Sequence, residues 1–224
     1  MNIEKYINKT YPGKKTKYIA YGADITKSST SDQQLQKWYD QFKIIKGNYY
    51  LIVGRFVPEN NFETMIKEFM RSSTQKDLVI ITNVEKNKFY EKLIKKTCFE
   101  NDKRIKFVGT VYDQSLLKKI REEAYGYIHG HEVGGTNPSL LEALGSTKLN
   151  LLLNVGFNNE VGGEGALYWT KKEGSLSNLI KETDFMDGTT INMLDKKSTE
   201  RVKNYYSWEK ICRDYESVFI EGGL

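Results

Sequence analysis

The chain has 224 residues, of which 39% are hydrophobic and 12% aromatic, so it can bury a core. It has no apolar run of membrane-spanning length, no signal-peptide core at its N-terminus, and two cysteines that give neither a disulfide framework nor a metal-binding spacing. The net charge of +5 is mild and dispersed, which argues against nucleic-acid binding and is compatible with weak attraction to an anionic membrane. We expect a cytoplasmic protein, peripheral at most to the inner face of the membrane.

The first part of the chain is predicted to contain little regular structure. A short helix is expected at residues 3–9, and the apolar pattern of residues 17–24 predicts a brief strand that ends in a turn. Residues 26–36 are rich in Ser, Thr, Asp and Gln, a composition typical of a linker.

After this linker, short apolar runs alternate with segments of helical periodicity. Strands are predicted at residues 49–53, 78–81, 105–108, 125–128 and 149–153. Helices are predicted at residues 61–71 and 86–97, after Asp113, from Pro138, and from Leu176 onward, ending with an amphipathic helix at residues 208–219. This alternation predicts an α/β fold, a Rossmann-like parallel sheet with helices on both faces, followed by C-terminal helices.

Three loops of this predicted sheet leave the carboxyl ends of strands, at residues 54–60, 109–112 and 129–137. Ligands of parallel α/β sheets bind outside the carboxyl ends of the strands. We therefore expect the three loops to face one crevice.

The segment from His129 to Gly145 contains the strongest indication of a ligand. Asn137 suits the cap of a helix, Pro138 its first turn, and Gly145 a left-handed closing residue. The glycine-rich turn before this helix exposes backbone N–H groups, which favours an anion such as a diphosphate. Glu142, about one turn further on, can accept hydrogen bonds from both hydroxyls of a ribose. The alternative is an ordinary strand–turn–helix corner with Glu142 on a solvated face, and both interpretations stay open on this segment alone.

Four segments together resemble a known enzyme family. They are residues 53–61 (VGRFVPENN), 105–111 (IKFVGTV), 134–143 (GGTNPSLLEA) and 206–209 (YSWE). Their order and spacing resemble the C-terminal, donor-binding half of family 4 glycosyltransferases, which have the GT-B fold. Within that family they are most similar to bacterial rhamnosyltransferases of surface-polysaccharide biosynthesis. The similarity covers residues 49–220.

The resemblance implies roles for individual residues. Arg55, beside Gly54, matches the arginine that grips the donor's diphosphate, and Glu142 matches the acid that holds the ribose; both are implied to be catalytic. The other positions implied to bind the donor are Gly134, Gly135, Thr136 and Asn137 as a cradle, Val111 and Tyr112 near the base, and Asn60, His129, His131 and Glu132. For Arg55, Tyr112 and the two histidines, a structural role is the alternative.

The sequence departs from the family pattern at two positions. Asn60 stands where the family often has lysine, and Gly134 stands where it has the first of two spaced glutamates. Glu132 is the nearest acid, and whether it substitutes stays open. Less positive charge is therefore expected at the phosphate site than the family usually has.

The resemblance also implies a domain organisation. Residues 1–25 match the last helix and strand of an N-terminal, acceptor-binding domain, and residues 26–48 a linker and lead-in helix. Residues 49–206 match the donor-binding domain, and residues 207–224 a C-terminal helix that returns toward the N-terminal domain. The chain is therefore expected to be about half of an enzyme and inactive by itself.

The implied function is donor binding in a retaining glycosyltransferase. The donor would be a nucleotide sugar such as dTDP-rhamnose or a UDP-sugar, and the acceptor a saccharide or lipid-linked saccharide held by the missing domain. The sequence has no Asp-x-Asp pair, so we expect no metal and no other cofactor. The alternative is a noncatalytic module that binds a nucleotide or nucleotide sugar.

Overall fold

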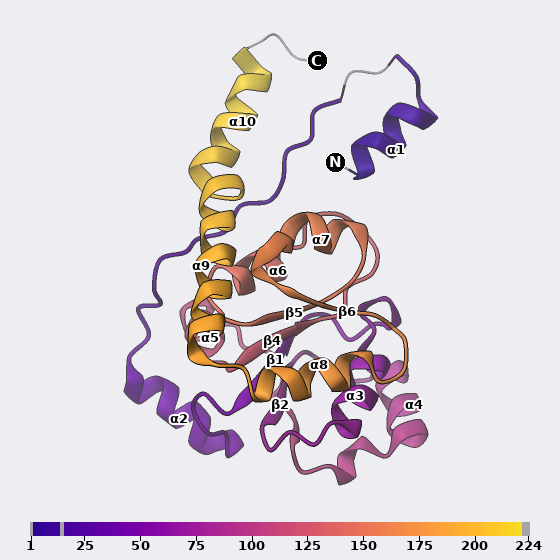
Figure 1. Cartoon of the computed structure of the whole chain (residues 1–224), viewed down its shortest axis with the longest axis vertical. Helices are drawn as coiled ribbons and strands as arrows, with labels where there is room; N and C mark the ends of the chain where they lie inside the picture. The colour runs from indigo at the N-terminus through magenta and orange to yellow at the C-terminus, as the bar shows by residue number, and fades with distance from the viewer. Residues whose placement is uncertain (1, 14–15, 221–224) are drawn as a thin grey trace.

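A six-stranded parallel sheet lies at the centre of the computed structural model, which describes residues 2–13 and 16–220 (Figure 1). Its strands are β1 (Tyr49–Val53), β2 (Asp77–Ile81), β3 (Ile105–Phe107), β4 (Gly126–His129), β5 (Asn150–Leu153) and β6 (Leu167–Trp169). They follow the order β3-β2-β1-β4-β5-β6, and all neighbouring pairs are parallel. The predicted fold class is confirmed, and β6 is a strand that the sequence pattern did not reveal.

The helices connect the strands and follow the sheet. They are α1 (Asn2–Thr10), α2 (Asp32–Phe42), α3 (Phe62–Arg71), α4 (Lys88–Thr97), α5 (Gln114–Glu122), α6 (Pro138–Leu144), α7 (Gly156–Gly162), α8 (Ser175–Asp184), α9 (Gly188–Tyr205) and α10 (Trp208–Ile220). Of the predicted terminal segments, residues 1, 14–15 and 221–224 lie outside the described residues. In the described part of the chain, every helix is too short or too polar to cross a membrane.

The two faces of the sheet are covered by different helices because successive strand side chains point to opposite sides. In β1, Tyr50 and Ile52 pack with residues of α3, α4 and α8, whereas Tyr49 and Leu51 pack with residues of α2 and α5. Toward β5, helices α6, α9 and α10 cover the second face around Leu152. Both faces are therefore apolar, as expected for a buried parallel sheet.

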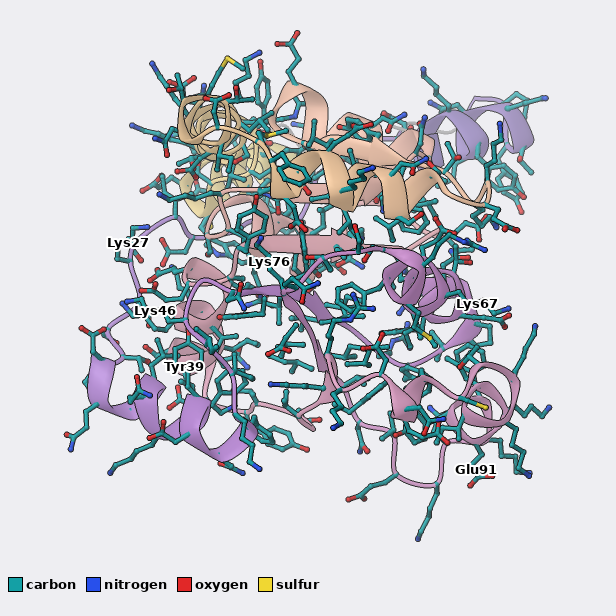
Figure 2. All side chains as sticks on the ribbon, turned by 60° about the horizontal axis from the view of Figure 1, so that its bottom comes forward. Lys27, Tyr39, Lys46, Lys67, Lys76 and Glu91 are labelled. Atoms are coloured by element: carbon teal, nitrogen blue, oxygen red, sulfur yellow. The ribbon has the colours of Figure 1, made fainter. Side chains whose placement is uncertain are left out.

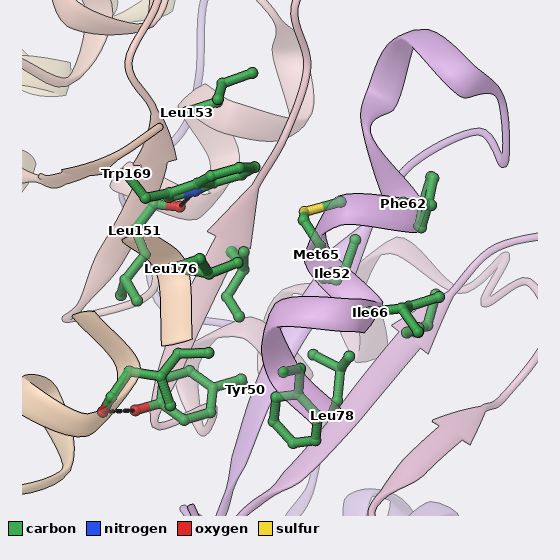
Figure 3. Packing of buried hydrophobic residues seen from close by; sticks show 14 of the residues in the cluster. Tyr50, Ile52, Phe62, Met65, Ile66, Leu78, Leu151, Leu153, Trp169 and Leu176 are labelled. Atoms are coloured by element: carbon green, nitrogen blue, oxygen red, sulfur yellow. Dashed lines mark hydrogen bonds between the residues drawn. The ribbon is translucent and has the colours of Figure 1, made fainter. Parts of the chain in front are cut away.

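Two large aromatic side chains are fully buried in the core between the sheet and α8 (Figure 3). The indole N–H of Trp169 donates to the backbone oxygen of Leu151 at 3.3 Å. The hydroxyl of Tyr50 lies 2.9 Å from the hydroxyl of Thr183 and 3.4 Å from the backbone oxygen of Ile180. Both polar groups are satisfied without water, so the rings contribute apolar area without an unpaired donor.

The predicted strand at residues 17–24 is wrong. The segment is extended and runs beside α10 and α9 toward α2 (Figure 1), with a single parallel bridge between Ala23 and Ser207. Gly22 lies flat against Trp208, where an added Cβ would be 2.6 Å from the ring. The segment forms no ladder because its neighbours are helices, whose backbone groups are already bonded.

The predicted linker is shorter than residues 26–36, because α2 already begins within it at Asp32. The side chain of Ser31 accepts a hydrogen bond from the backbone N–H of Gln34, so Ser31 is the helix cap. A polar composition that indicates a linker also suits the first turn of an exposed helix.

The basic side chains are distributed over several elements of the surface (Figure 2). Lys46, Lys67 and Lys76 each form an ion pair with a carboxylate, at 3.2, 2.6 and 3.0 Å respectively. Figure 2 also shows Lys27 and Glu91 on different parts of the molecule. The dispersed charge expected from the sequence is thus present in the structure, and much of it is paired locally.

Candidate functional site

The site forms where the winding of the sheet changes direction. Strands β1 and β4 are neighbours, with β2 and β3 on one side and β5 and β6 on the other. Such a switch point leaves a crevice because the loops after the two central strands turn to opposite faces. Here the loops after β1 and β4 meet: the backbone N–H of Glu132 donates to the backbone oxygen of Glu59 at 3.2 Å.

A cavity of about 230 Å³, which we call the Arg55 cavity, lies between these loops. Six of the predicted site residues line it: Gly54, Arg55, Asn60, His129, His131 and Asn137. Arg55 is exposed and takes part in none of the ion pairs formed among the described residues. No Asp or Glu lines the cavity within the described part of the chain, so its only formal charge is positive.

Asn60 joins the two loops, which explains its presence at a position where lysine is frequent in the resembled family. Its side-chain N–H donates to the backbone oxygen of Arg55 at 2.7 Å, and its Oδ1 lies 2.5 Å from Nδ1 of His131. Gly130 lets the loops approach this closely, because an added Cβ would lie 2.6 Å from the backbone oxygen of Asn60. The rim of the cavity is therefore held by short polar contacts.

His129, at the end of β4, is a buried histidine with an unused polar atom. The residue is 5% exposed, and Nε2 has no hydrogen-bond partner among the residues that the structure describes. Burial, together with the neighbouring His131, lowers the pKa of His129 to about 3. The ring is therefore neutral at physiological pH, and it lines the cavity as an uncharged group. His131 is half-buried, and desolvation lowers its pKa as well.

The glycine-rich turn borders a second cavity of about 430 Å³, the Tyr18 cavity. Gly135 and Thr136 line it together with Tyr18, whose hydroxyl lies 2.6 Å from Oγ1 of Thr136. Gly134 adopts φ +130°, which a side chain would disfavour. The predicted cradle thus contacts the N-terminal segment of the chain.

The helix after this turn begins as predicted but ends differently. Asn137 accepts the N–H of Leu140 at 3.2 Å and Pro138 occupies the first turn, so both predictions are confirmed. The left-handed cap predicted at Gly145 is wrong, because its φ is −85° and the chain continues in a right-handed turn. Since α6 has seven residues, its dipole is small, and Arg55 is the main source of positive charge at the cavity.

Glu142 lies apart from the Arg55 cavity and borders a third cavity of about 200 Å³, the Glu142 cavity. Its Oε2 lies 2.6 Å from Nη2 of Arg121 in α5. The side chain of Arg121 is 4% exposed and that of Glu142 is 43% exposed. Sequence reasoning missed Arg121 because it is one basic residue among several on α5. The periodicity of the apolar residues identifies core positions, and it gives no indication that a charged residue is buried.

Several other predicted residues lie outside the Arg55 cavity. The carboxylate of Glu132 pairs with Lys171 at 2.5 Å and with the amide of Asn61 at 3.2 Å. The Lys171 hydrogen bond lowers the pKa of Glu132. Val111 packs against the core near α5, and Tyr112 is 83% exposed. The donor-binding roles of all these residues stay predictions.

Ser139 is a cavity residue that sequence reasoning missed. It lines the Arg55 cavity, and its hydroxyl lies 3.0 Å from the hydroxyl of Tyr127 and 3.3 Å from the backbone oxygen of Val53. Its place directly after Pro138, in the first turn of a helix that follows a glycine-rich loop, is the signal that could have indicated it. In the portion of the chain that is described, no three His, Cys, Asp or Glu side chains are grouped as metal ligands.

Comparison with known proteins gave matches at the level of structure. No protein-family model and no curated protein matches the sequence. A glycosyltransferase from Rickettsia africae superposes with a TM-score of 0.84 at 12% identity, over 98% of this chain and 61% of that one. Anabaena HepE in complex with UDP and glucose has a TM-score of 0.78 at 16% identity, over 92% of this chain and 56% of that one.

A sucrose-phosphate synthase from Thermosynechococcus elongatus has a TM-score of 0.76 at 17% identity, over 97% of this chain and 56% of that one. The chain thus spans between 56% and 61% of the length of these three structures. At such low identity the likeness concerns the fold, which is that of a domain of GT-B glycosyltransferases.

The buried neutral ring of His129 predicts a specific acid sensitivity. Its pKa is 6.5 when exposed and about 3 when folded, so between these pH values the unfolded chain binds the additional proton. The free energy of unfolding should therefore fall on acidification by up to about 1.4 kcal/mol per pH unit from this group. Urea unfolding of wild type and His129→Leu between pH 7 and 4 should show a shallower loss in the variant. If the free energy of unfolding falls with pH equally in wild type and variant, the lowered pKa of His129 is contradicted.

The unequal exposure of the Arg121–Glu142 pair predicts unequal effects of mutation. Glu142→Ala leaves a buried guanidinium unpaired and should destabilise the protein by about 3–5 kcal/mol. Arg121→Met leaves a half-exposed carboxylate that water can solvate, so its cost should be smaller. Urea denaturation measures both, and equal destabilisation would show that the burial of Arg121 does not control the pair.

Proposed function

We propose that this chain is the nucleotide-sugar-binding region of a glycosyltransferase. The observation that carries the proposal is the Arg55 cavity, where loops from both sides of the β1/β4 switch point bring an exposed arginine next to neutral polar groups. In the described ranges of the chain, this cavity has one cation without a carboxylate partner, no acid and several hydrogen-bonding groups, which suits an anion that also carries hydroxyls.

The chemistry of Arg55 supports a diphosphate in particular. A guanidinium presents a planar set of donors that matches phosphate oxygens, and this one is not neutralised by a carboxylate among the described residues. In a glycosyl transfer, negative charge accumulates on the departing nucleotide diphosphate. A preorganised cation at this position would stabilise that charge.

The structural neighbours support the same class of ligand. Anabaena HepE has been solved with UDP, with UDP and glucose, and with UDP-glucose. By analogy, we propose a dTDP- or UDP-linked sugar as the donor, bound without a metal, and a rhamnosyl or other hexosyl group as the group transferred with retention. The saccharide or lipid-linked acceptor would be bound by a second domain that faces the crevice, at the inner face of the membrane.

A noncatalytic nucleotide-binding module is the second candidate. Two features favour it: Asn60 supplies no positive charge, and Glu132 is held by Lys171 at 2.5 Å, where a catalytic acid would need to be available. Transfer by the complete enzyme that disappears in Arg55→Ala would decide for catalysis. If the complete protein binds the nucleotide but transfers no sugar, the noncatalytic module is the correct interpretation.

Binding of a nucleotide diphosphate should depend on Arg55. Loss of a charge-assisted contact costs about 1.5–3 kcal/mol, so Arg55→Ala should weaken binding of UDP or dTDP ten- to a hundredfold by calorimetry. The nucleosides, which have no phosphate, should bind the variant and the wild type equally. Arg213→Ala is a matched control because it removes an equal charge from the exposed face of α10. If Arg55→Ala weakens binding of the nucleoside and of the nucleotide diphosphate equally, Arg55 does not contact the phosphates.

The chain by itself should bind donor and fail to transfer sugar. Transfer in a two-domain crevice requires an acceptor that is oriented by the opposite wall, and this proximity effect amounts to about 7–11 kcal/mol. The measurement is acceptor-dependent release of nucleotide diphosphate from the best-binding sugar nucleotide, with and without EDTA. Robust release would contradict the half-enzyme proposal, and its loss in EDTA would contradict metal independence.

A further inference from the structure

The ion pair between Arg121 and Glu142 is unusual in its orientation. The guanidinium lies inside the protein with its side chain 4% exposed, and the carboxylate reaches the surface with its side chain 43% exposed. The pair uses Nη2 of the arginine and Oε2 of the glutamate, while Nε of Arg121 is buried and has no partner within residues 2–13 and 16–220. The ion pair therefore leaves one buried N–H of the guanidinium unused.

Ser139 connects the pair to the Arg55 cavity, although neither member of the pair lines that cavity. Nη2 of Arg121 is 3.5 Å from the hydroxyl of Ser139, and Ser139 lines that cavity. Ser139 and Glu142 are three residues apart on α6, so they lie on one face of the helix. A ligand with a phosphate at Arg55 would reach the carboxylate of Glu142 by extending along this face of α6.

From this geometry we infer that Arg121 is a positioning residue for the ligand's ribose. The guanidinium holds Glu142 through one carboxylate oxygen, and the carboxylate then accepts hydrogen bonds from the neighbouring 2′- and 3′-hydroxyls. This inference rests on the proposed function, since it takes the bound molecule to be a nucleotide.

The charges around Glu142 favour hydroxyls over other ligand groups. Arg121 neutralises the glutamate, and Lys118, which borders the same Glu142 cavity, is paired with Asp24 at 3.1 Å. Counted over its described lining residues, the Glu142 cavity therefore has no excess positive charge that would attract a second phosphate. A carboxylate can only accept hydrogen bonds, and a ribose diol offers two donors at adjacent positions.

The test compares the affinities of UDP and 2′,3′-dideoxy-UDP by calorimetry. Wild type should bind UDP more tightly by about ten- to a hundredfold, the contribution expected for hydrogen bonds to a charged group. Arg121→Met should remove most of this preference while binding of the dideoxy compound stays the same. Arg121→Lys, which keeps the charge, should recover part of the preference.

Two further variants separate positioning from folding. Glu142→Gln keeps an acceptor for Arg121, so it should fold normally and lose the same preference; the double variant Arg121→Met/Glu142→Gln should lose no more than either single variant. Lys119→Met removes a charge from the same helix whose partners are Asp32 and Glu123, and it should bind both compounds as the wild type does.

Distinct outcomes overturn the inference and the proposed function. If Arg121→Met or Glu142→Gln weakens both compounds equally, or leaves the preference intact, Arg121 does not position a ribose-binding group. In that case Arg55-dependent binding of UDP would still support the proposed function. If the wild-type chain binds neither UDP nor dTDP, the proposed function and the inference both fail.

Discussion

The parallel pairing of β1 with β4 is the constraint on which the rest of the site depends. Because these strands are adjacent in space but far apart in sequence, the loops that follow them start at the same edge and turn to opposite faces. Gly126 permits this pairing, since an added Cβ would lie 3.1 Å from the ring of Tyr50. The Arg55 cavity is a consequence of this topology, and the side chains decide only how it is lined.

The positive charge of the Arg55 cavity persists because nearby carboxylates are paired with other cations. Glu132 is paired with Lys171, and Glu142 is paired with Arg121. Both acids of the loop–helix segment are thereby kept from cancelling the charge of Arg55. Among the described residues, the crevice contains one unpaired guanidinium and no acid, so its local charge has a larger effect than the mild net charge of +5 would indicate.

Small polar residues, instead of long charged side chains, hold the loops after β1 and β4 in position. Asn60 bonds to both loops, Asn158 donates to the backbone oxygen of His131 at 3.0 Å, and Gly130 removes the side chain that would separate the loops. The resulting rim is short and largely uncharged. Such contacts fix the two loops relative to each other, and a preorganised rim lowers the ordering cost of a binding site.

The sequence by itself determined the elements whose signals are local. Apolar period, helix caps and turn residues predicted five strands and the helix after Asn137, because each depends on neighbours a few residues away. The meeting of the loops after β1 and β4 followed from the general rule that ligands of parallel α/β sheets bind at the carboxyl ends of the strands. Only the tertiary structure decided that residues 17–24 form a single bridge, from Ala23 to Ser207 between α9 and α10, instead of a strand. It also decided that β6 extends the sheet and that Arg121 lies under Glu142. Those outcomes depend on residues distant in sequence: edge pairing requires a free strand nearby, and a buried ion pair requires two helices to pack. The tertiary structure also separated the predicted site into three cavities, since contacts across the crevice follow from packing and not from spacing along the chain.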